Sequence, residues 1–166
     1  MAMENSEEMR LEIRRLGRAD EAHQCAELMA NSEPWVTLRR TYDNSMRTLS
    51  DPSREVYVAL VKDKVVGFIV LIMSGALVGY IQTVGVVPEW RNKGVGSKLL
   101  KFAEDLIFSK APNVFMCVSS FNKKAQKLYE MLGYATIGEL KDYIVPGHSE
   151  ILLRKTVAPI TEFKRT

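Results

Sequence analysis

Residues 84–100 carry the sequence VGVVPEWRNKGVGSKLL, which changes character twice within this short stretch. An apolar run typical of a strand gives way to a turn containing Gly94 and Gly96, and an amphipathic helix follows. Glycine lets a backbone turn tightly and leaves its N–H groups uncovered. The first turn of a helix adds unpaired N–H groups and the positive end of the helix dipole. Together with the side chains of Arg91, Lys93 and Lys98, this arrangement predicts a phosphate-binding site.

The spacing of the glycines narrows the class of ligand. A dinucleotide-binding turn requires a third glycine where this chain has Leu99, and a P-loop requires Gly-Lys-Ser/Thr where this chain has Gly-Ser-Lys at 96–98. The pattern that fits is R-x-x-G-x-G, over residues 91–96. On its own this pattern is equally typical of an ordinary strand-to-helix loop.

A second motif lies downstream and changes the interpretation. Residues 120–134 read SFNKKAQKLYEMLGY and match N-x-x-A-x-x-x-Y-x-x-x-G-F/Y. With both motifs present in this order, the chain resembles the GNAT superfamily of acyl-CoA-dependent N-acetyltransferases over residues 10–156. The resemblance implies an α/β (α+β) GNAT fold, with a mostly antiparallel twisted sheet, a central parallel strand pair and helices on both faces.

The hydrophobic periodicity predicts the individual elements. We expect strands at 11–14, 56–61, 65–73, 77–86, 114–118, 136–141 and 150–155, and helices at 19–30, 36–49, 95 onward and 123–132. The third helix should bury Val95, Leu99, Phe102, Ala103 and Leu106. The chain is expected to form a flexible N-terminus at 1–9, one domain at 10–156 and a tail at 157–166.

Composition excludes several classes of protein. The net charge of +3 is too small, and the basic residues too scattered, to predict nucleic-acid binding. Two cysteines and two histidines give neither a disulfide framework nor metal-ligand spacing, so we expect no metal. Without a signal-peptide pattern or a long apolar run, the chain is expected to be cytoplasmic and independent of membranes. It is compatible with a homodimer.

The resemblance implies a binding site for acetyl-CoA as co-substrate. The family's strand edge and loop, together with the asparagine of the second motif, correspond to Val84, Gly85, Val86, Arg91, Asn92, Lys93, Gly94, Val95, Gly96, Ser97 and Asn122. Gly85 is expected to mark a β-bulge that opens the strand edge. Asn122 also suits the N-cap of the following helix, and one residue can serve both roles.

Two tyrosines are the candidate catalytic residues. By resemblance, Tyr129 points its phenol at the sulfur of the coenzyme and protonates the leaving thiolate; the alternative is a core tyrosine. The glutamate that many relatives use as general base is replaced by Cys117, which has the character of a small buried hydrophobe. The stretch YIQTVG at 80–85 is similar to the corresponding strand of a eukaryotic N-terminal α-amine acetyltransferase, which has a tyrosine at this position. This resemblance implies Tyr80 as the candidate base, directly or through a water molecule, with a half-buried strand tyrosine as the alternative.

The expected reaction is direct transfer of an acetyl group to a primary amine, without a covalent enzyme intermediate. A protein or peptide N-terminal amine is favoured as acceptor. A polyamine or aminoglycoside is the alternative. Such an acceptor usually requires a carboxylate-lined pocket, which the short run at 51–55 and the polar stretch at 31–33 support only weakly. A non-catalytic CoA-binding regulatory module is the remaining alternative. Asp142, Tyr143, His148 and Glu150 lie in or beside a loop expected to face the acceptor.

Overall fold

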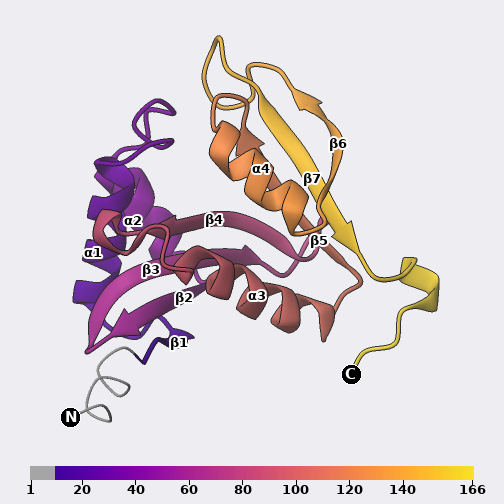
Figure 1. Ribbon diagram of the computed structural model, residues 1–166, viewed down its shortest axis with the longest axis horizontal. Helices are drawn as coiled ribbons and strands as arrows, with labels where there is room; N and C mark the ends of the chain where they lie inside the picture. The colour runs from indigo at the N-terminus through magenta and orange to yellow at the C-terminus, as the bar shows by residue number, and fades with distance from the viewer. Residues whose placement is uncertain (1–9) are drawn as a thin grey trace.

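A seven-stranded sheet organises residues 10–166, which are the residues described by the computed structural model (Figure 1). Its strands are β1 (Glu12–Arg15), β2 (Arg54–Val61), β3 (Lys64–Ile72), β4 (Tyr80–Val86), β5 (Asn113–Ser119), β6 (Ala135–Leu140) and β7 (Glu150–Thr156). They lie in the order β1-β2-β3-β4-β5-β7-β6, and only β4 and β5 run parallel. The expected sheet is confirmed, whereas the N-terminal segment 1–9 lies outside the described residues.

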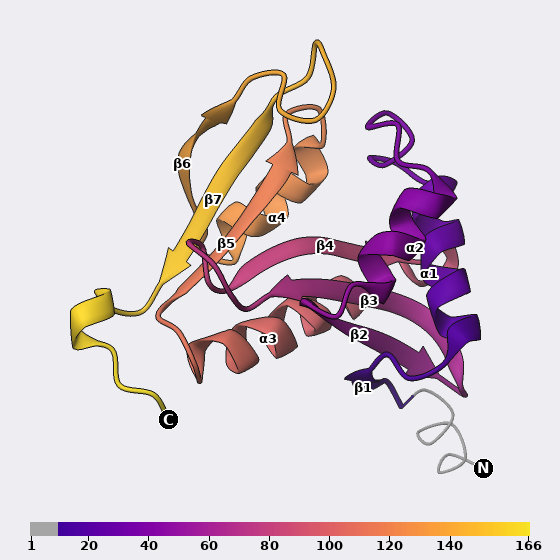
Figure 2. The same ribbon diagram turned by 180° about the vertical axis from the view of Figure 1, so that it is seen from behind.

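Helices cover both faces of this sheet, as expected (Figures 1 and 2). The helices are α1 (Ala19–Ala30), α2 (Tyr42–Ser50), α3 (Val95–Phe108) and α4 (Lys123–Met131), with short 3₁₀ turns η1 (Pro88–Trp90) and η2 (Ile160–Glu162). Alternate residues of β2 supply the two cores, because successive side chains of a strand point to opposite faces. Val58 and Leu60 pack in the cluster of α1, and Ala59 and Val61 pack in the cluster of α3.

The predicted face of α3 is largely correct. Val95, Leu99 and Ala103 are buried, while Phe102 and Leu106 are half-buried. Leu100 and Ile107 complete the buried face, so the apolar stripe of α3 is wider than predicted.

The two parallel strands separate soon after they meet. Their pairing is limited to Tyr80 with Phe115 and Ile81 with Met116. Beyond these pairs the β5-facing edge of β4 has no strand partner within residues 10–166. The chain crosses between the two strands through η1, a loop and α3, so the separation opens beside the start of that helix. The open strand edge is the feature that positions the functional site.

A bulge lies on this edge, although not at the expected position. Val70 pairs with Thr83 and Leu71 pairs with Ile81, which leaves Gln82 as the extra residue. Gly85 pairs regularly with Phe68. A Cβ atom at Gly85 would lie 2.5 Å from Phe68 Cε1 and 3.0 Å from Trp35 Cη2, so the glycine is needed for packing. The prediction of a bulge at Gly85 is therefore wrong.

Two predicted element boundaries are also wrong. The helix expected at 36–49 begins only at Tyr42, because Thr41 is an extended N-cap whose hydroxyl accepts a 3.2 Å hydrogen bond from the Asn44 N–H. Residues 35–39 form turns instead. The strand expected at 77–86 begins at Tyr80, because Gly79 adopts φ +86° and packs against the Asn113 carbonyl.

Candidate active site

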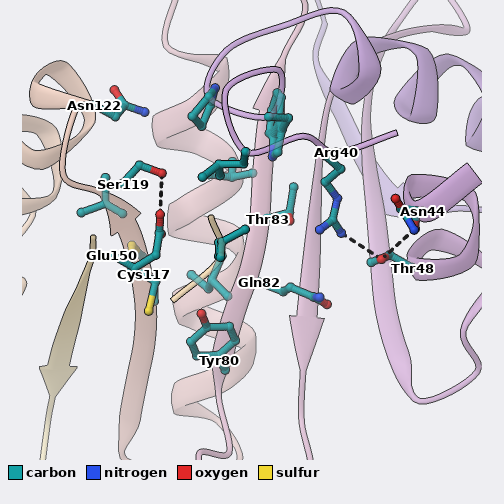
Figure 3. Close-up of a pocket in the computed structure, with 18 of the residues that line it drawn as sticks. Arg40, Asn44, Thr48, Tyr80, Gln82, Thr83, Cys117, Ser119, Asn122 and Glu150 are labelled. Carbon is teal, nitrogen blue, oxygen red and sulfur yellow. Dashed lines mark hydrogen bonds between the residues drawn. The ribbon is translucent and has the colours of Figure 1, made fainter. Parts of the chain in front are cut away.

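Two cavities meet at Asn122, which lines both of them. We call the first the loop cavity; it has a volume of about 350 Å³ and is lined by Val86, Trp90, Arg91, Asn92, Gly94, Val95, Gly96, Ser97, Asn122, Lys124, Ala125 and Leu128. We call the second, of about 460 Å³, the central cavity. It lies between the segment joining α1 to α2, strands β4 and β5, and the start of β7 (Figure 3).

The loop cavity brings the two sequence motifs together. Asn122 is the N-cap of α4 and accepts a 3.3 Å hydrogen bond from the Ala125 N–H through Oδ1. Lys124 Nζ donates a 2.6 Å hydrogen bond to Asn92 Oδ1, which ties α4 to the glycine loop. Lys93 does not line the cavity; its ammonium lies over the Trp90 ring, 5.1 Å from the centroid.

The two loop glycines have different roles. Gly94 adopts φ +82° and is the N-cap of α3, with no side chain capping the helix. Asn92 adopts φ +58°, so the tight turn consists of Asn92 and Gly94. Gly96 lies inside the first turn of α3, and a Cβ atom there would contact only Val86 Cγ2, at 3.6 Å. The expectation that Gly96 forms the turn is wrong; it leaves space beside the helix N-terminus.

The expected strand edge is divided between the two cavities. Val84 lines the central cavity and Val86 lines the loop cavity, whereas the buried Gly85 lines neither. The guanidinium of Arg91 donates a 3.1 Å hydrogen bond from Nε to the Val86 carbonyl, which holds the loop against the end of β4.

A polar cluster lies in the central cavity where β4, β5 and β7 come together (Figure 3). Tyr80 and Cys117 both line this part of the cavity, and each affects the pKa of the other. Ser119 Oγ donates a 2.7 Å hydrogen bond to Glu150 Oε1. Cys117 is half-buried and lines the cavity, so its expected role as a buried hydrophobe is wrong.

The environment shifts the pKa values of this cluster. Burial, and then the Cys117 contact, raises the pKa of Tyr80 above its ordinary value. Burial also raises the pKa of the Cys117 thiol. The pKa of Glu150 is raised by burial, and the Ser119 hydrogen bond opposes part of that shift. Glu150 is therefore the group in this cluster whose pKa moves toward neutrality.

Tyr129 lies in the core and also faces the central cavity, so it has features of both alternatives, a core tyrosine and a catalytic one. It is 8% exposed and its ring packs edge-on against Tyr134, with centroids 6.0 Å apart, yet it also lines the central cavity. Burial raises the pKa of Tyr129 to about 12, so its phenol stays protonated at neutral pH.

The prediction that four residues face the acceptor is only partly correct. Of Asp142, Tyr143, His148 and Glu150, only Glu150 lines the central cavity. Asp142 Oδ1 accepts a 2.7 Å hydrogen bond from the Gly147 N–H, and His148 packs edge-on against Phe121. The acidic residues of 31–33 and 51–55 do not line this cavity. Their expected contribution to an acidic pocket is therefore wrong.

Arginines from the segment 39–47 line the wall of the central cavity that faces the β7 side, and they were not predicted from the sequence. Arg39, Arg40 and Arg47 all belong to the lining. Glu150, by contrast, was expected to face the acceptor, and it lies at the start of β7. No comparable signal marked the arginines, because residues 36–41 were assigned to a helix.

No group of three His, Cys, Asp or Glu side chains suited to a metal occurs within residues 10–166. No helix in these residues is long and apolar enough to cross a bilayer.

The fold and the two motifs together define a class of acyl-group transferase. A model of the acetyltransferase (GNAT) family matches residues 19–134, and the chain belongs to this family. An aminoglycoside 6′-N-acetyltransferase complexed with coenzyme A has the same fold, with a TM-score of 0.71 and 20% identity over 89% of this chain and 98% of that one.

Two curated relatives illustrate the range of similarity. The chain is 29% identical to N-alpha-acetyltransferase RimI of Mycobacterium tuberculosis over 148 residues, which cover 84% of this chain and 89% of that protein. It is 30% identical to the thialysine N-epsilon-acetyltransferase of Mus musculus over 66 residues, which cover only 39% of each chain.

Proposed function

We propose that this protein transfers an acetyl group from acetyl-CoA directly to a primary amine. The observation that carries the proposal is that the two cavities meet at Asn122. The loop cavity holds the residues suited to a coenzyme, and the central cavity holds the titratable groups suited to an amine. The thioester and the amine would then meet in the opening between β4 and β5.

The residues of the loop cavity fit the pyrophosphate of coenzyme A. The N-terminus of α3 has no side-chain cap, so the N–H groups of its first turn are available for phosphate oxygens. Arg91 and Lys124 add positive charge beside them. The bound co-substrate would supply an activated acetyl group, and the unpaired edge of β4 would hold its pantetheine arm as an additional strand.

Glu150 is the proposed proton acceptor for the amine. An amine must lose its proton before it attacks, and a base works best with a pKa near the working pH. The buried carboxylate of Glu150 is shifted in that direction and oriented by Ser119. The Tyr80 phenol is protonated because its pKa is raised, so it would position the amine or a water molecule and pass the proton onward.

Tyr129 is the proposed donor to the leaving thiolate. When the new N–C bond forms and the C–S bond breaks, negative charge collects on sulfur. A phenol with a pKa of about 12 is a weaker acid than a thiol, so Tyr129 would stabilise the thiolate mainly by a hydrogen bond. Cys117 is not a proposed nucleophile, because its raised pKa disfavours the reactive thiolate.

A protein or peptide N-terminal amine is the proposed acceptor class. A relative that matches 84% of this chain is an N-alpha-acetyltransferase by name. A regulatory module without catalysis would not need a buried carboxylate beside the open strand edge. The two cysteines are unpaired, which supports the proposed location in a reducing cytoplasm.

Release of coenzyme A from acetyl-CoA tests the proposal directly. The purified chain is assayed with N-terminal peptides, free amino acids, polyamines and aminoglycosides. We expect turnover with at least one amine, and Glu150→Gln should lower kcat near neutral pH by ~10²–10⁴-fold, the usual range for a general base.

Two variants sharpen this assay. Glu104→Gln is the matched control, because Glu104 is a buried carboxylate bonded to Tyr134 and Lys155 that does not line the central cavity. Tyr80→Phe should lower the rate near neutrality and regain part of it at high pH, where the amine is already neutral. Tight acetyl-CoA binding without turnover of any amine would instead favour a regulatory module.

A further inference from the structure

Arg40 places a guanidinium in the central cavity. Its Nη2 donates a 2.9 Å hydrogen bond to Thr48 Oγ1, and its Nε is buried with no hydrogen-bond partner in the described part of the chain. No carboxylate within residues 10–166 forms an ion pair with Arg40. Burial also lowers the pKa of its guanidinium. A cation taken out of water without an opposite charge is unfavourable unless a ligand supplies that charge.

The local structure holds Arg40 in this place. Its backbone N–H donates a 2.9 Å hydrogen bond to the Trp35 carbonyl, and the Trp35 ring packs on Phe68 with centroids 6.3 Å apart. The absence of a Cβ atom at Gly85 makes room for that packing. The segment between α1 and α2 is thus anchored on the sheet, and it presents Arg40 to the cavity.

A second hydrogen-bond donor in the same cavity is Gln82, the extra residue of the β4 bulge. Arg54 Nε donates a 2.9 Å hydrogen bond to Gln82 Oε1, which orients the amide so that its NH₂ group remains available. Gln82 lines the central cavity, and its side chain points to the same side of β4 as Arg40 and Thr48 (Figure 3). A bulge commonly re-aims a side chain toward a site in this way.

The charges of the central cavity are therefore separated between its two walls. Among residues 10–166, Glu150 is the only carboxylate that lines the cavity, and it lies on the β7 side. Arg40 lies across β4 from it, with Arg39 and Arg47 also in the lining. An acceptor that places its amine near Glu150 would expose its other end to positive charge. Such a cavity disfavours a polyamine, which carries further positive charges.

We infer that the amine acceptor of this enzyme carries a carboxylate, which Arg40 and Gln82 bind while the amine lies beside Glu150. The inference rests on the proposed acetyl transfer and assigns its acceptor class. The carboxylate comes either from a free amino acid or from an acidic side chain near a peptide N-terminus. One half-buried guanidinium and one amide suit a monoanion better than a phosphate dianion.

Matched acceptors test the inference. Alanine is compared with alaninamide, and a peptide with aspartate at its second position is compared with the same peptide carrying asparagine; spermidine and phosphoethanolamine complete the set. We expect kcat/KM to be ~10–100-fold higher for the carboxylate member of at least one pair, the usual effect of a charged hydrogen bond. The pair that responds identifies the source of the carboxylate.

Variants connect that preference to Arg40. Arg40→Gln should raise KM for the carboxylate acceptor and bring the kcat/KM ratio of the pair close to one, with little change for the amide member. Arg40→Lys should retain part of the preference. Arg15→Gln is the control, because Arg15 is an exposed cation on β1 that does not line the cavity. Thermal unfolding verifies that each variant is folded.

The remaining outcomes separate the inference from the proposed function. Equal rates within both pairs, or a preference for spermidine or phosphoethanolamine, would overturn the inference and leave acetyl transfer intact. If no amine is acetylated, calorimetry with CoA present compares N-acetylalanine with N-acetylalaninamide. Tighter binding of N-acetylalanine that is lost in Arg40→Gln supports the anion site without the proposed reaction. Equal binding of the two compounds, or no binding of either, contradicts the anion site.

Discussion

Ser119 and Glu150 are partners across the β5–β7 ladder, and the Ser119 hydroxyl donates a 2.7 Å hydrogen bond to the Glu150 carboxylate. Both residues are nearly inaccessible to solvent, at 3% and 4% exposure. The register of two antiparallel strands thus fixes the position of the carboxylate that we propose as the base. Because the strands are in the core of the domain, this orientation does not depend on a mobile loop.

The Ser119 hydroxyl should tune the pH dependence of the reaction. Its hydrogen bond favours the ionised form of Glu150 and opposes the rise in pKa that burial causes. Ser119→Ala should therefore raise the pKa of Glu150 further and move the acidic limb of the kcat–pH profile to higher pH. Profiles at saturating acceptor, with Ser109→Ala as control, measure the shift. An unchanged limb would remove Glu150 as the titrating base.

Tyr129→Phe should separate catalysis from coenzyme binding. The substitution removes one hydroxyl and keeps the ring that packs on Tyr134. We expect kcat to fall by ~10²–10³-fold, as when one hydrogen-bond donor to a developing anion is removed, while acetyl-CoA affinity is nearly unchanged. Tyr134→Phe is the control, because the Tyr134 hydroxyl bonds to Glu104, and its loss should affect stability more than kcat. Wild-type turnover in Tyr129→Phe would leave Tyr129 as a core residue only.

Gly96→Val should weaken coenzyme binding without unfolding the protein. Gly96 has ordinary helical geometry and a Cβ atom would clear Val86 Cγ2 at 3.6 Å, so a larger side chain fits the fold but fills the loop cavity. Gly94→Ala, by contrast, should cost stability of ~1 kcal/mol through its positive φ. Calorimetric titration with acetyl-CoA and thermal unfolding measure the two effects. Full affinity in folded Gly96→Val would exclude this loop from the site.

Glu21 should make the fold sensitive to acid. It is fully buried and accepts hydrogen bonds from Arg14 and from the N–H groups of Gly17 and Arg18 at the start of α1. The Arg14 hydrogen bond is the largest cause that lowers the pKa of Glu21 to about 2. Because the pKa is lower in the folded state, this stabilisation is complete above the unfolded value and is lost as the pH falls toward 2.

We expect this pKa shift to contribute about 2 kcal/mol to the free energy of unfolding. This is less than the full shift implies, because Arg14 is partly exposed and water screens the ion pair. Denaturant unfolding between pH 7 and pH 2.5 should show a smaller pH dependence in Glu21→Gln than in the wild type. Glu27→Gln, which alters an exposed carboxylate of the same helix, is the control. Identical pH dependence in Glu21→Gln and the wild type would contradict this role for Glu21.

The sequence by itself determined the parts of the protein whose contacts are local. The glycine loop, the helix after it and the Asn122 cap involve residues within a few positions of one another, so their motifs predicted them directly. The positions of the strands along the chain and most of the buried face of α3 also followed from periodicity, whereas the parallel strand pair was expected only from the family resemblance. The start of α2 was missed because the Thr41 cap interrupted an otherwise helical pattern.

Only the tertiary structure decided what surrounds the amine. Tyr80, Ser119 and Glu150 come from three strands, and their proximity depends on the β4–β5 pairing and the β5–β7 register. Arg40 reaches the same cavity because Trp35 packs against Phe68. No local sequence pattern encodes these distances. A strand can shift by two residues against its neighbour and still bury the same face, so the pattern does not determine which residues become partners. The coenzyme loop could therefore be predicted from neighbouring residues, whereas the charges that select the acceptor arise from strand pairing and packing.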